Sequence, residues 1–398
     1  MLFNGLIQPN LNIFLNFFTI VYVPAFLVLI SIFLLIFLII FKLESHNSIK
    51  ILLATTLTLI FFNIIDNTKH HNQIKFFEKQ SIKKFENSKI ILIFDEMSGM
   101  NSLASKSPEG KIVNQNFIKL FDKYNFNYYP NIFSISDNTV GSLSSLINFK
   151  TKLTEDNIKK FSSPSKNYFS EYNIKQNNLF DKHKSVSVIQ NMHINFCNNS
   201  NVTKCYQYNP LNLEIINADI DPLSKIISSW SLNGSIVAKL IWRVFKQFGL
   251  ITSILEPEGE KKFIKEIFNY TLNEINSKKY DLIFLHILVP HIPYGFNKKC
   301  EYNVKISNFN TYLNQEAKIK QHNIERNCLI NFIDKFLNKI DFIDNHKIFI
   351  MSDHGSRIAN VKNSSFTTIF AHKNVNSIIG NSLNEKNMHK EFKILNNE

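Results

Sequence analysis

The sequence predicts an α/β/α sandwich, in which helices cover both faces of a mostly parallel central sheet, preceded by N-terminal transmembrane helices. Continuous apolar runs of strand length recur after residue 88, and long segments with helical periodicity separate them. Strands that alternate with long helices pair in parallel, because each crossover returns the chain to the same edge of the sheet. A long charge-free run near the N-terminus predicts the membrane part.

The N-terminal segment has the pattern of a membrane anchor. No charged side chain precedes Lys42, and residues 17–41 form an apolar run longer than the roughly 20 residues that a transmembrane helix needs. It lacks the positive start and the cleavage site of a signal peptide. A shorter run predicts a second span over about residues 50–66, with an interfacial or buried helix as the alternative. We therefore expect an anchor over residues 1–66 and a linker over 67–88.

Two features disagree about which side of the membrane the rest of the chain occupies. Five lysines follow Asp66 closely, and by the positive-inside tendency they favour the cytoplasm. The cysteines favour the opposite side, because Cys197 with Cys205 and Cys300 with Cys328 form two locally spaced pairs, as an oxidising compartment permits. Free buried thiols are the alternative. We expect both pairs to be disulfides, and a periplasmic domain held at the inner (cytoplasmic) membrane.

The charge and apolar content of the chain limit the kinds of partner that it is expected to bind. The chain has 45 Lys+Arg against 32 Asp+Glu, a net charge of +13, and a 44% hydrophobic content that excludes disorder for most of its length. The lysines are scattered, with no compact basic run carrying interleaved aromatics, so nucleic-acid binding is not expected. Besides the lipid bilayer, the expected partner is an anionic phospholipid or glycan. Alternatively, the positive net charge reflects a compositional bias and has no function.

Residues 89–375 are predicted to form one α/β domain. Four apolar runs have the length of buried strands: residues 89–94, 282–288, 347–351 and 366–371. Five segments have helical periodicity: residues 114–124, 140–148, 235–248, 261–275 and 313–340. The polar, Asn-rich residues 150–221 predict a loop-rich insertion, and residues 376–398 a polar C-terminal tail.

Metal-capable side chains directly follow three of the predicted strands. Asp95 and Glu96 follow the first, His291 follows the second, and Asp353 with His354 follows the third. Parallel strands end at one edge of the sheet, which is where α/β proteins place their binding sites. Carboxylates and imidazoles gathered there predict a site for a divalent cation.

A fourth segment, residues 136–142 (SDNTVGS), leads into a predicted helix. A hydroxyl at a helix N-terminus lies beside free backbone N–H groups and the positive end of the helix dipole, which stabilise an anion. Ordinary N-capping by Ser, Thr, Asn or Asp is the competing interpretation. His286 lies inside an apolar strand, and we expect it to be a packed core histidine rather than a functional one.

The order of these motifs resembles that of the alkaline phosphatase superfamily. Within it, the resemblance is to the sulfatase-like branch, which includes membrane-anchored phosphoethanolamine transferases and lipoteichoic acid synthases. The matching segments are residues 91–99 (ILIFDEMSG), 129–149 (YPNIFSISDNTVGSLSSLINF), 286–294 (HILVPHIPY) and 348–356 (IFIMSDHGS). SDHG after a strand is the most specific match, and the resemblance spans roughly residues 89–371.

The resemblance implies a membrane-anchored, metal-dependent transferase or hydrolase acting on phospho-groups of a lipid or surface glycan. Carried over residue by residue, the metal ligands are Asp95, Glu96, Thr139, Asp353 and His354. Thr139 is implied as the nucleophile, and His291 as the histidine that contacts the transferred group or a second metal. The expected cofactor is a divalent ion, either Zn, Mn, Mg or Ca.

The chain departs from the family in two ways. Sulfatases that use formylglycine need Cys or Ser in a C/S-x-P-x-R signature, which the segment around Thr139 lacks. Sulfuric ester hydrolysis is therefore the alternative rather than the leading function, and a non-catalytic binding protein on the same fold is a second alternative. Only 43 of the 398 residues follow Gly355, whereas relatives usually carry a further His or Lys and a C-terminal subdomain in this part; Arg357 and His372 are the candidates for the missing positive charge.

Overall fold

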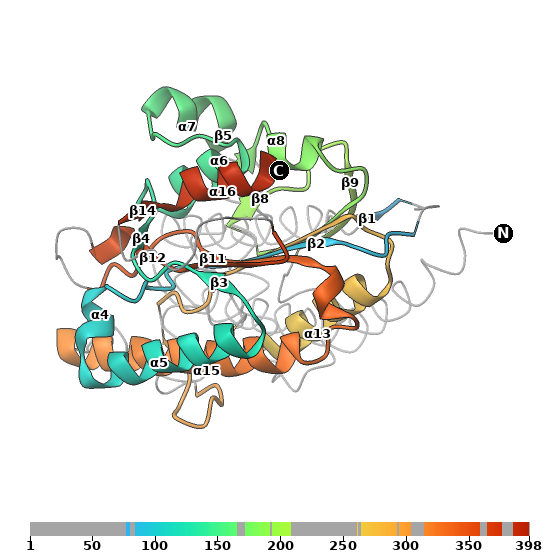
Figure 1. The fold of residues 1–398 in the computed structure, drawn as a ribbon. Helices are drawn as coiled ribbons and strands as arrows, with labels where there is room; N and C mark the ends of the chain where they lie inside the picture. The colour runs from blue at the N-terminus through green and yellow to red at the C-terminus, as the bar shows by residue number, and fades with distance from the viewer. Residues whose placement is uncertain are drawn as a thin grey trace, which may run out of the picture. The chain divides into compact units, whose positions relative to one another are not determined.

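Figure 1 shows the computed structural model of the chain. It describes residues 77–79, 84–164, 172–191, 193–207, 261, 264–292, 294–303, 314–358, 364–375 and 385–397. These belong to one compact unit, Lys75–Asn209 with Ile254–Glu398. The two predicted spans and the helix predicted over residues 235–248 lie outside the described residues. Within the described ranges, no helix is both long enough and apolar enough to cross a membrane.

A mostly parallel sheet organises the described residues. Eight of their strands pair in the order β1, β9, β7, β10, β2, β11, β13, β3. From β9 to β11 every pairing is parallel, and β1, β13 and β3 pair antiparallel at the edges. The strands are β1 (Phe77–Glu78), β9 (Val202–Gln207), β7 (Val186–Gln190), β10 (Leu282–Ile287), β2 (Lys89–Phe94), β11 (Lys347–Ser352), β13 (Phe370–Lys373) and β3 (Asn127–Tyr128). The predicted α/β class is confirmed.

The register of the three central strands sets the position of the polar motifs. Strand β2 (KIILIF) is buried from Ile90 onward and β10 (LIFLHI) throughout, as expected of parallel strands covered on both faces. At their ends, Phe94 of β2 pairs with Ile287 of β10 on one side and Ser352 of β11 on the other. The residues that follow these strands therefore leave the sheet at the same edge.

Helices pack on the two faces of this sheet, as Figure 1 shows. On one face, Leu143 of α6 and Phe392 of α16 share an apolar cluster with Ile91 and Phe349 of the central strands. On the other face α13 packs on β10, and α15 packs on α5 and α13. The helices are α4 (Leu103–Lys106), α5 (Pro108–Lys123), α6 (Thr139–Ile147), α7 (Glu155–Phe161), α8 (Asn178–Asp181), α13 (Ile264–Asn276), α15 (Gln315–Leu337) and α16 (Met388–Asn397).

Two parts of the chain differ from the sequence prediction. The segment expected as a loop-rich insertion contributes β7 and β9 to the central sheet, together with the small sheet of β5 (Ser162–Pro164), β6 (Tyr172–Ile174) and β8 (Ile194–Asn195). The segment expected as a polar tail contains β14 (Lys386–Asn387), which pairs with β4 (Ile132–Phe133) beside β12 (Thr367–Thr368), and then α16. In α16, Met388, Phe392 and Leu395 are buried because their spacing places them on one helix face.

Both predicted disulfides are present. Cys197 is bonded to Cys205 of β9, and Cys300 to Cys328 of α15. The first bridge closes a short segment at the edge of the sheet. The second ties the loop after β10 to α15, which lies on one face of the sheet.

One buried histidine gives a prediction about stability and pH. His389 of α16 is buried with Nε2 3.0 Å from the carbonyl oxygen of Ser142, and burial lowers the pKa of His389 from 6.5 to about 4. The unfolded chain binds more protons than the folded chain between these pKa values, so the free energy of unfolding falls as pH falls through this window. His389→Gln keeps an N–H donor and cannot titrate. Between pH 7 and 5 it should lose about 1–2 kcal/mol less stability than the wild type in urea denaturation. Equal losses of unfolding free energy in the wild type and in His389→Gln would contradict the lowered pKa of His389.

Candidate active site and metal cluster

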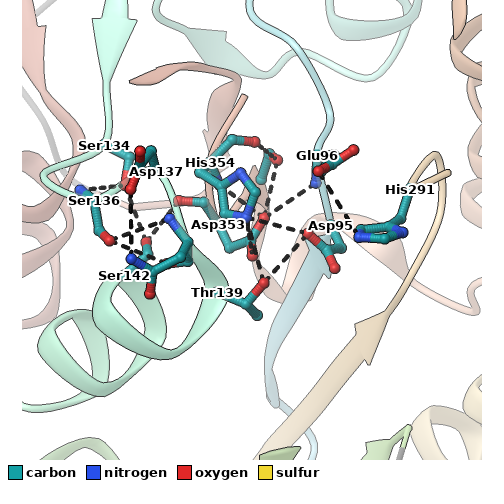
Figure 2. Close-up of polar contacts among 12 residues, drawn as sticks. Asp95, Glu96, Ser134, Ser136, Asp137, Thr139, Ser142, His291, Asp353 and His354 are labelled. Carbon is teal, nitrogen blue, oxygen red and sulfur yellow. Dashed lines mark hydrogen bonds and ion pairs between the residues drawn. The ribbon is translucent and has the colours of Figure 1, made fainter. Parts of the chain in front are cut away.

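Three of the predicted metal ligands converge at the edge of the sheet. Asp95 follows β2, and Asp353 and His354 follow β11; one ligand atom from each lies within 4.8 Å of the others, and all three residues are buried. His354 Nε2 is 3.5 Å from Asp95 Oδ1 and 3.5 Å from Asp353 Oδ2 (Figure 2). The parallel register alone accounts for this meeting of residues far apart in sequence.

Hydrogen bonds orient these side chains toward one point. Asp353 Oδ1 accepts the backbone N–H groups of Glu96 at 3.2 Å and His354 at 2.7 Å. Among the described residues, its buried Oδ2 accepts no hydrogen bond. His354 Nδ1 lies 2.8 Å from the carbonyl oxygen of Gly355, which assigns the proton to Nδ1 and leaves the Nε2 lone pair facing the aspartates.

The cluster concentrates negative charge in a buried place. Burial, with the carboxylates of Asp353 and Glu96, raises the pKa of Asp95 well above its ordinary value. Burial also tends to raise the pKa of Asp353. This effect is outweighed by the rings of His354 and His286 and by the backbone N–H of His354, so the pKa of Asp353 is lowered. The carboxylates of Asp95 and Asp353, the second with an unbonded Oδ2, and the lone pair of His354 Nε2 form a donor set that fits a divalent cation.

Thr139 is the first residue of α6 and points at the same cluster. Its Oγ1 lies 3.5 Å from Asp95 Oδ1 and 3.3 Å from His354 Nε2. The helix begins here because the Asn138 side chain caps it, accepting the N–H of Gly141 at 2.8 Å. Thr139 is therefore not the N-cap, and the capping interpretation applies to its neighbour.

Ser142, one turn further along α6, fixes the helix against the loop that follows β11. Its Oγ donates to the backbone carbonyl of Asp353 at 2.6 Å and lies 3.0 Å from Ser134 Oγ. This contact joins residues 211 positions apart, so no local sequence signal predicts it. It holds the N-terminus of α6 beside Asp353.

Glu96 and His291 form a second group with Arg357, beside the cluster. Glu96 has a left-handed backbone (φ 60°), and its Oε1 accepts from Arg357 Nε at 2.7 Å. Arg357 Nη2 lies 3.2 Å from His291 Nε2, which is 3.8 Å from Glu96 Oε1. Burial lowers the pKa of His291, against the opposite influence of Glu96. The Glu96 carboxylate thus lies in an ion pair with Arg357, outside the three-residue cluster.

The other two histidine candidates, His286 and His372, are not among the three clustered ligands. His286 is buried within β10, with Nδ1 3.4 Å from Asn191 Nδ2, and its pKa is lowered to about 4, first by burial. His372 is buried in β13 among the rings of Tyr129, Phe349 and Phe370. Of the two basic candidates, Arg357 is therefore the one at the site.

A cavity of about 530 Å³ opens onto the cluster. Asp95, His291 and Arg357 supply ionisable groups to its lining. Tyr172 of β6 and His193 also line it, and their rings pack edge to face. Sequence reasoning missed these two because they lie in the segment read as an insertion. The lining residues are Asp95, Asn138, Thr139, Val140, Ile158, Tyr172, His193, Leu288, His291 and Arg357.

No family model and no curated protein matches the chain. The solved structures that it resembles include phosphoethanolamine transferases and a lipoteichoic acid synthase, the proteins that the sequence resemblance names. The integral membrane lipooligosaccharide phosphoethanolamine transferase A of Neisseria meningitidis is 11% identical, with a TM-score of 0.47 over 86% of this chain and 60% of its own length. The chain therefore spans less than two thirds of that protein.

Two further structures are similar at comparable levels. The periplasmic domain of EptC from Escherichia coli, in complex with Zn, is 13% identical, with a TM-score of 0.42 over 75% of each chain. The lipoteichoic acid synthase LtaP of Listeria monocytogenes is 10% identical, with a TM-score of 0.40 over 77% of this chain and 68% of its own. At TM-scores below 0.5 these likenesses carry no argument about activity, and the function proposed below rests on the site itself.

The cluster predicts which substitutions remove bound metal. Asp353→Asn and His354→Ala should each weaken metal affinity by orders of magnitude, because each removes a ligand from a small set. The purified variants should therefore contain less metal than the wild type. Glu96→Gln should retain the metal, since Arg357 already holds that carboxylate. Asp137→Asn, which neutralises an exposed acid outside the cluster, is the control. Elemental analysis after gel filtration measures the stoichiometry, and unchanged metal in the first two variants would remove the proposed site.

Proposed function

We propose that the protein is a metal-dependent transferase or hydrolase that acts on a phospho-group through Thr139. The observation that carries this proposal is the position of the Thr139 hydroxyl. It lies within 3.5 Å of Asp95 and His354, at the first residue of a helix, and lines a cavity large enough for a substrate headgroup. A binding protein has no need of a hydroxyl placed among ligands in this way.

The metal cluster would supply the activation that a threonine needs. Asp95, Asp353 and His354 would hold the cation, and a bound divalent ion lowers the pKa of a hydroxyl and neutralises charge that develops on the transferred group. The ion is Zn, Mn, Mg or Ca in this proposal, with Thr139 as a further ligand proposed from the family resemblance. Glu96, the other ligand that the resemblance implies, pairs with Arg357, so we propose no metal contact for it. The unbonded Oδ2 of Asp353 supports an ion at this place.

The chain's own residues account for the rest of the reaction. Thr139 Oγ1 forms a bond to phosphorus while the bond to the leaving oxygen breaks, and a water or acceptor hydroxyl then displaces Thr139 in a second step. The first turn of α6 directs its backbone N–H groups and positive dipole end at the nucleophile. His291 and Arg357 border the same cavity and would contact the oxygens of the transferred group.

The proposed substrate is an anionic phospholipid or a surface glycan at a membrane. In this proposal residues 1–66 anchor the chain, residues 67–88 link the anchor to the domain, and the domain lies on the periplasmic side of the cytoplasmic membrane. Two disulfides support an oxidising compartment, which outweighs the lysines that follow Asp66. An anchored domain would meet phospholipid headgroups directly.

Removing the nucleophile tests the proposal. Thr139→Ala should keep its metal and fold yet lose turnover of phosphodiesters by several orders of magnitude, because a methyl group cannot form the covalent intermediate. Thr139→Ser retains the hydroxyl and should keep part of the activity. Steady-state rates on phosphodiester and aryl sulfate substrates provide the measurement. Normal turnover by Thr139→Ala would overturn the assignment, and a marked preference of the wild type for aryl sulfates would favour the sulfatase alternative.

Arg357 gives a second test, independent of the metal. Its side chain is half exposed and borders the cavity, so Arg357→Ala should reduce kcat/KM by about 10²–10³, the loss typical of one preorganised donor. Inhibition by inorganic phosphate should weaken in parallel, and Arg357→Lys should restore part of both. Lys339→Ala, which removes an exposed cation away from the cavity, controls for net charge. Equal phosphate inhibition in the wild type and Arg357→Ala would exclude this role.

A further inference from the structure

One face of α15 holds the loop that carries His291. Gln321, His322, Glu325 and Cys328 recur at helical spacing, and all four contact the loop between Tyr294 and Cys300. Two of the polar side chains on this face, His322 and Glu325, are fully buried, which is unusual unless they are bonded. None of the four lines the cavity.

Glu325 makes two of these contacts. Its Oε1 accepts two consecutive backbone N–H groups, from Gly295 and Phe296, each at 2.6 Å. Its side chain is fully buried, so the two N–H donors offset the cost of burying the carboxylate. A carboxylate that accepts two successive N–H groups fixes the orientation of the peptide between them.

A buried lysine extends this hold to His291 itself. Lys261 Nζ lies 4.0 Å from Glu325 Oε2 and donates to the backbone carbonyl of His291 at 2.5 Å. Lys261 and Glu325 therefore bind the loop at two places, Lys261 at His291 and Glu325 at Gly295 and Phe296. Because both charges are buried, removing one partner would leave the other uncompensated.

Two further contacts from α15 close the far end of the loop. Gln321 Nε2 donates to the carbonyl of Phe296 at 2.6 Å, and the disulfide joins Cys300 to Cys328. His291 follows β10 beyond the last paired residue, Ile287, so the sheet itself does not fix it. The position of its ring beside Arg357 thus depends on how the loop is held from α15.

We propose that Glu325 is a positioning residue for His291, acting through the backbone of residues 291–296, with Lys261 and the Cys300–Cys328 bridge completing the same anchor. This inference rests on the proposed function of the site. Displacing a group at a reacting centre by about 1 Å can cost on the order of 10²-fold in rate. The anchor therefore affects turnover without touching the substrate or the metal.

The test compares two substitutions on the same helix in the full-length protein. Glu325→Ala removes the acceptor, and Asn323→Ala removes a buried side chain two residues away that bonds the carbonyl of Ala104 instead of the loop. Hydrogen exchange of peptides covering residues 288–300, metal content, phosphate binding by calorimetry, and kcat and KM are measured for each.

For Glu325→Ala we expect at least tenfold faster exchange at the amides of Gly295 and Phe296, unchanged metal content, and kcat lowered 10–100-fold. Asn323→Ala should leave exchange in this loop as in the wild type. Glu325→Gln keeps an acceptor oxygen for the two N–H groups but leaves the charge of Lys261 without its partner, so it should recover only part of the exchange protection and rate. Unchanged loop exchange and kcat in Glu325→Ala, or equal effects in Asn323→Ala, would overturn the inference.

The two disulfides supply a second pair of variants in case Glu325→Ala does not fold. The double substitution Cys300→Ser with Cys328→Ser should loosen the loop and weaken phosphate binding, whereas Cys197→Ser with Cys205→Ser should do neither; equal effects would again overturn the inference. If the wild type turns over no phosphodiester, the proposed function fails. Loop exchange and phosphate binding then still decide whether Glu325 holds the His291 segment.

Discussion

Parallel pairing of β2, β10 and β11 is the constraint on which the site depends. Phe94 lies between Ile287 and Ser352 in register, so the residues after these strands leave the sheet together. Because the strands are buried on both faces, the polar groups of the site follow the strands instead of lying within them. The ligand atoms of Asp95, Asp353 and His354 therefore lie within 4.8 Å of one another, although Asp95 is far from the other two in sequence.

The cost of burying charge explains much of the remaining arrangement. Most buried acids near the site are compensated by the protein: backbone N–H groups hold Asp353 Oδ1 and Glu325, and Arg357 holds Glu96. The groups left without such compensation, Asp95 and the second oxygen of Asp353, face the hydroxyl of Thr139. The proposed ion and reaction thus occupy the point where the fold leaves negative charge unmatched.

The sequence predicts the parts of this site that depend on local patterns, and it does not predict those that depend on contacts between residues far apart in the chain. Strands β2, β10 and β11 are predictable because a buried parallel strand is a continuous apolar run. The polar residues directly after these runs are then expected at the same edge of the sheet. Strands β7 and β9 are hard to recognise because their flanks are rich in Asn, and α16 because one of its faces is polar. Arg357 reaches Glu96 across 261 positions, so no local pattern selects it over His372. The same applies to Tyr172 and His193, which reach the cavity through a small sheet.

The most direct test of the central claim is to look for the covalent intermediate. The purified metal-loaded protein is incubated with a phospholipid labelled in its headgroup phosphate, quenched with acid, digested and analysed by mass spectrometry. The account predicts a phospho-substituent on Thr139 that disappears when an acceptor alcohol is added before the quench. Product formation with an unmodified Thr139 peptide at every time point, or with the label on another residue, would contradict it.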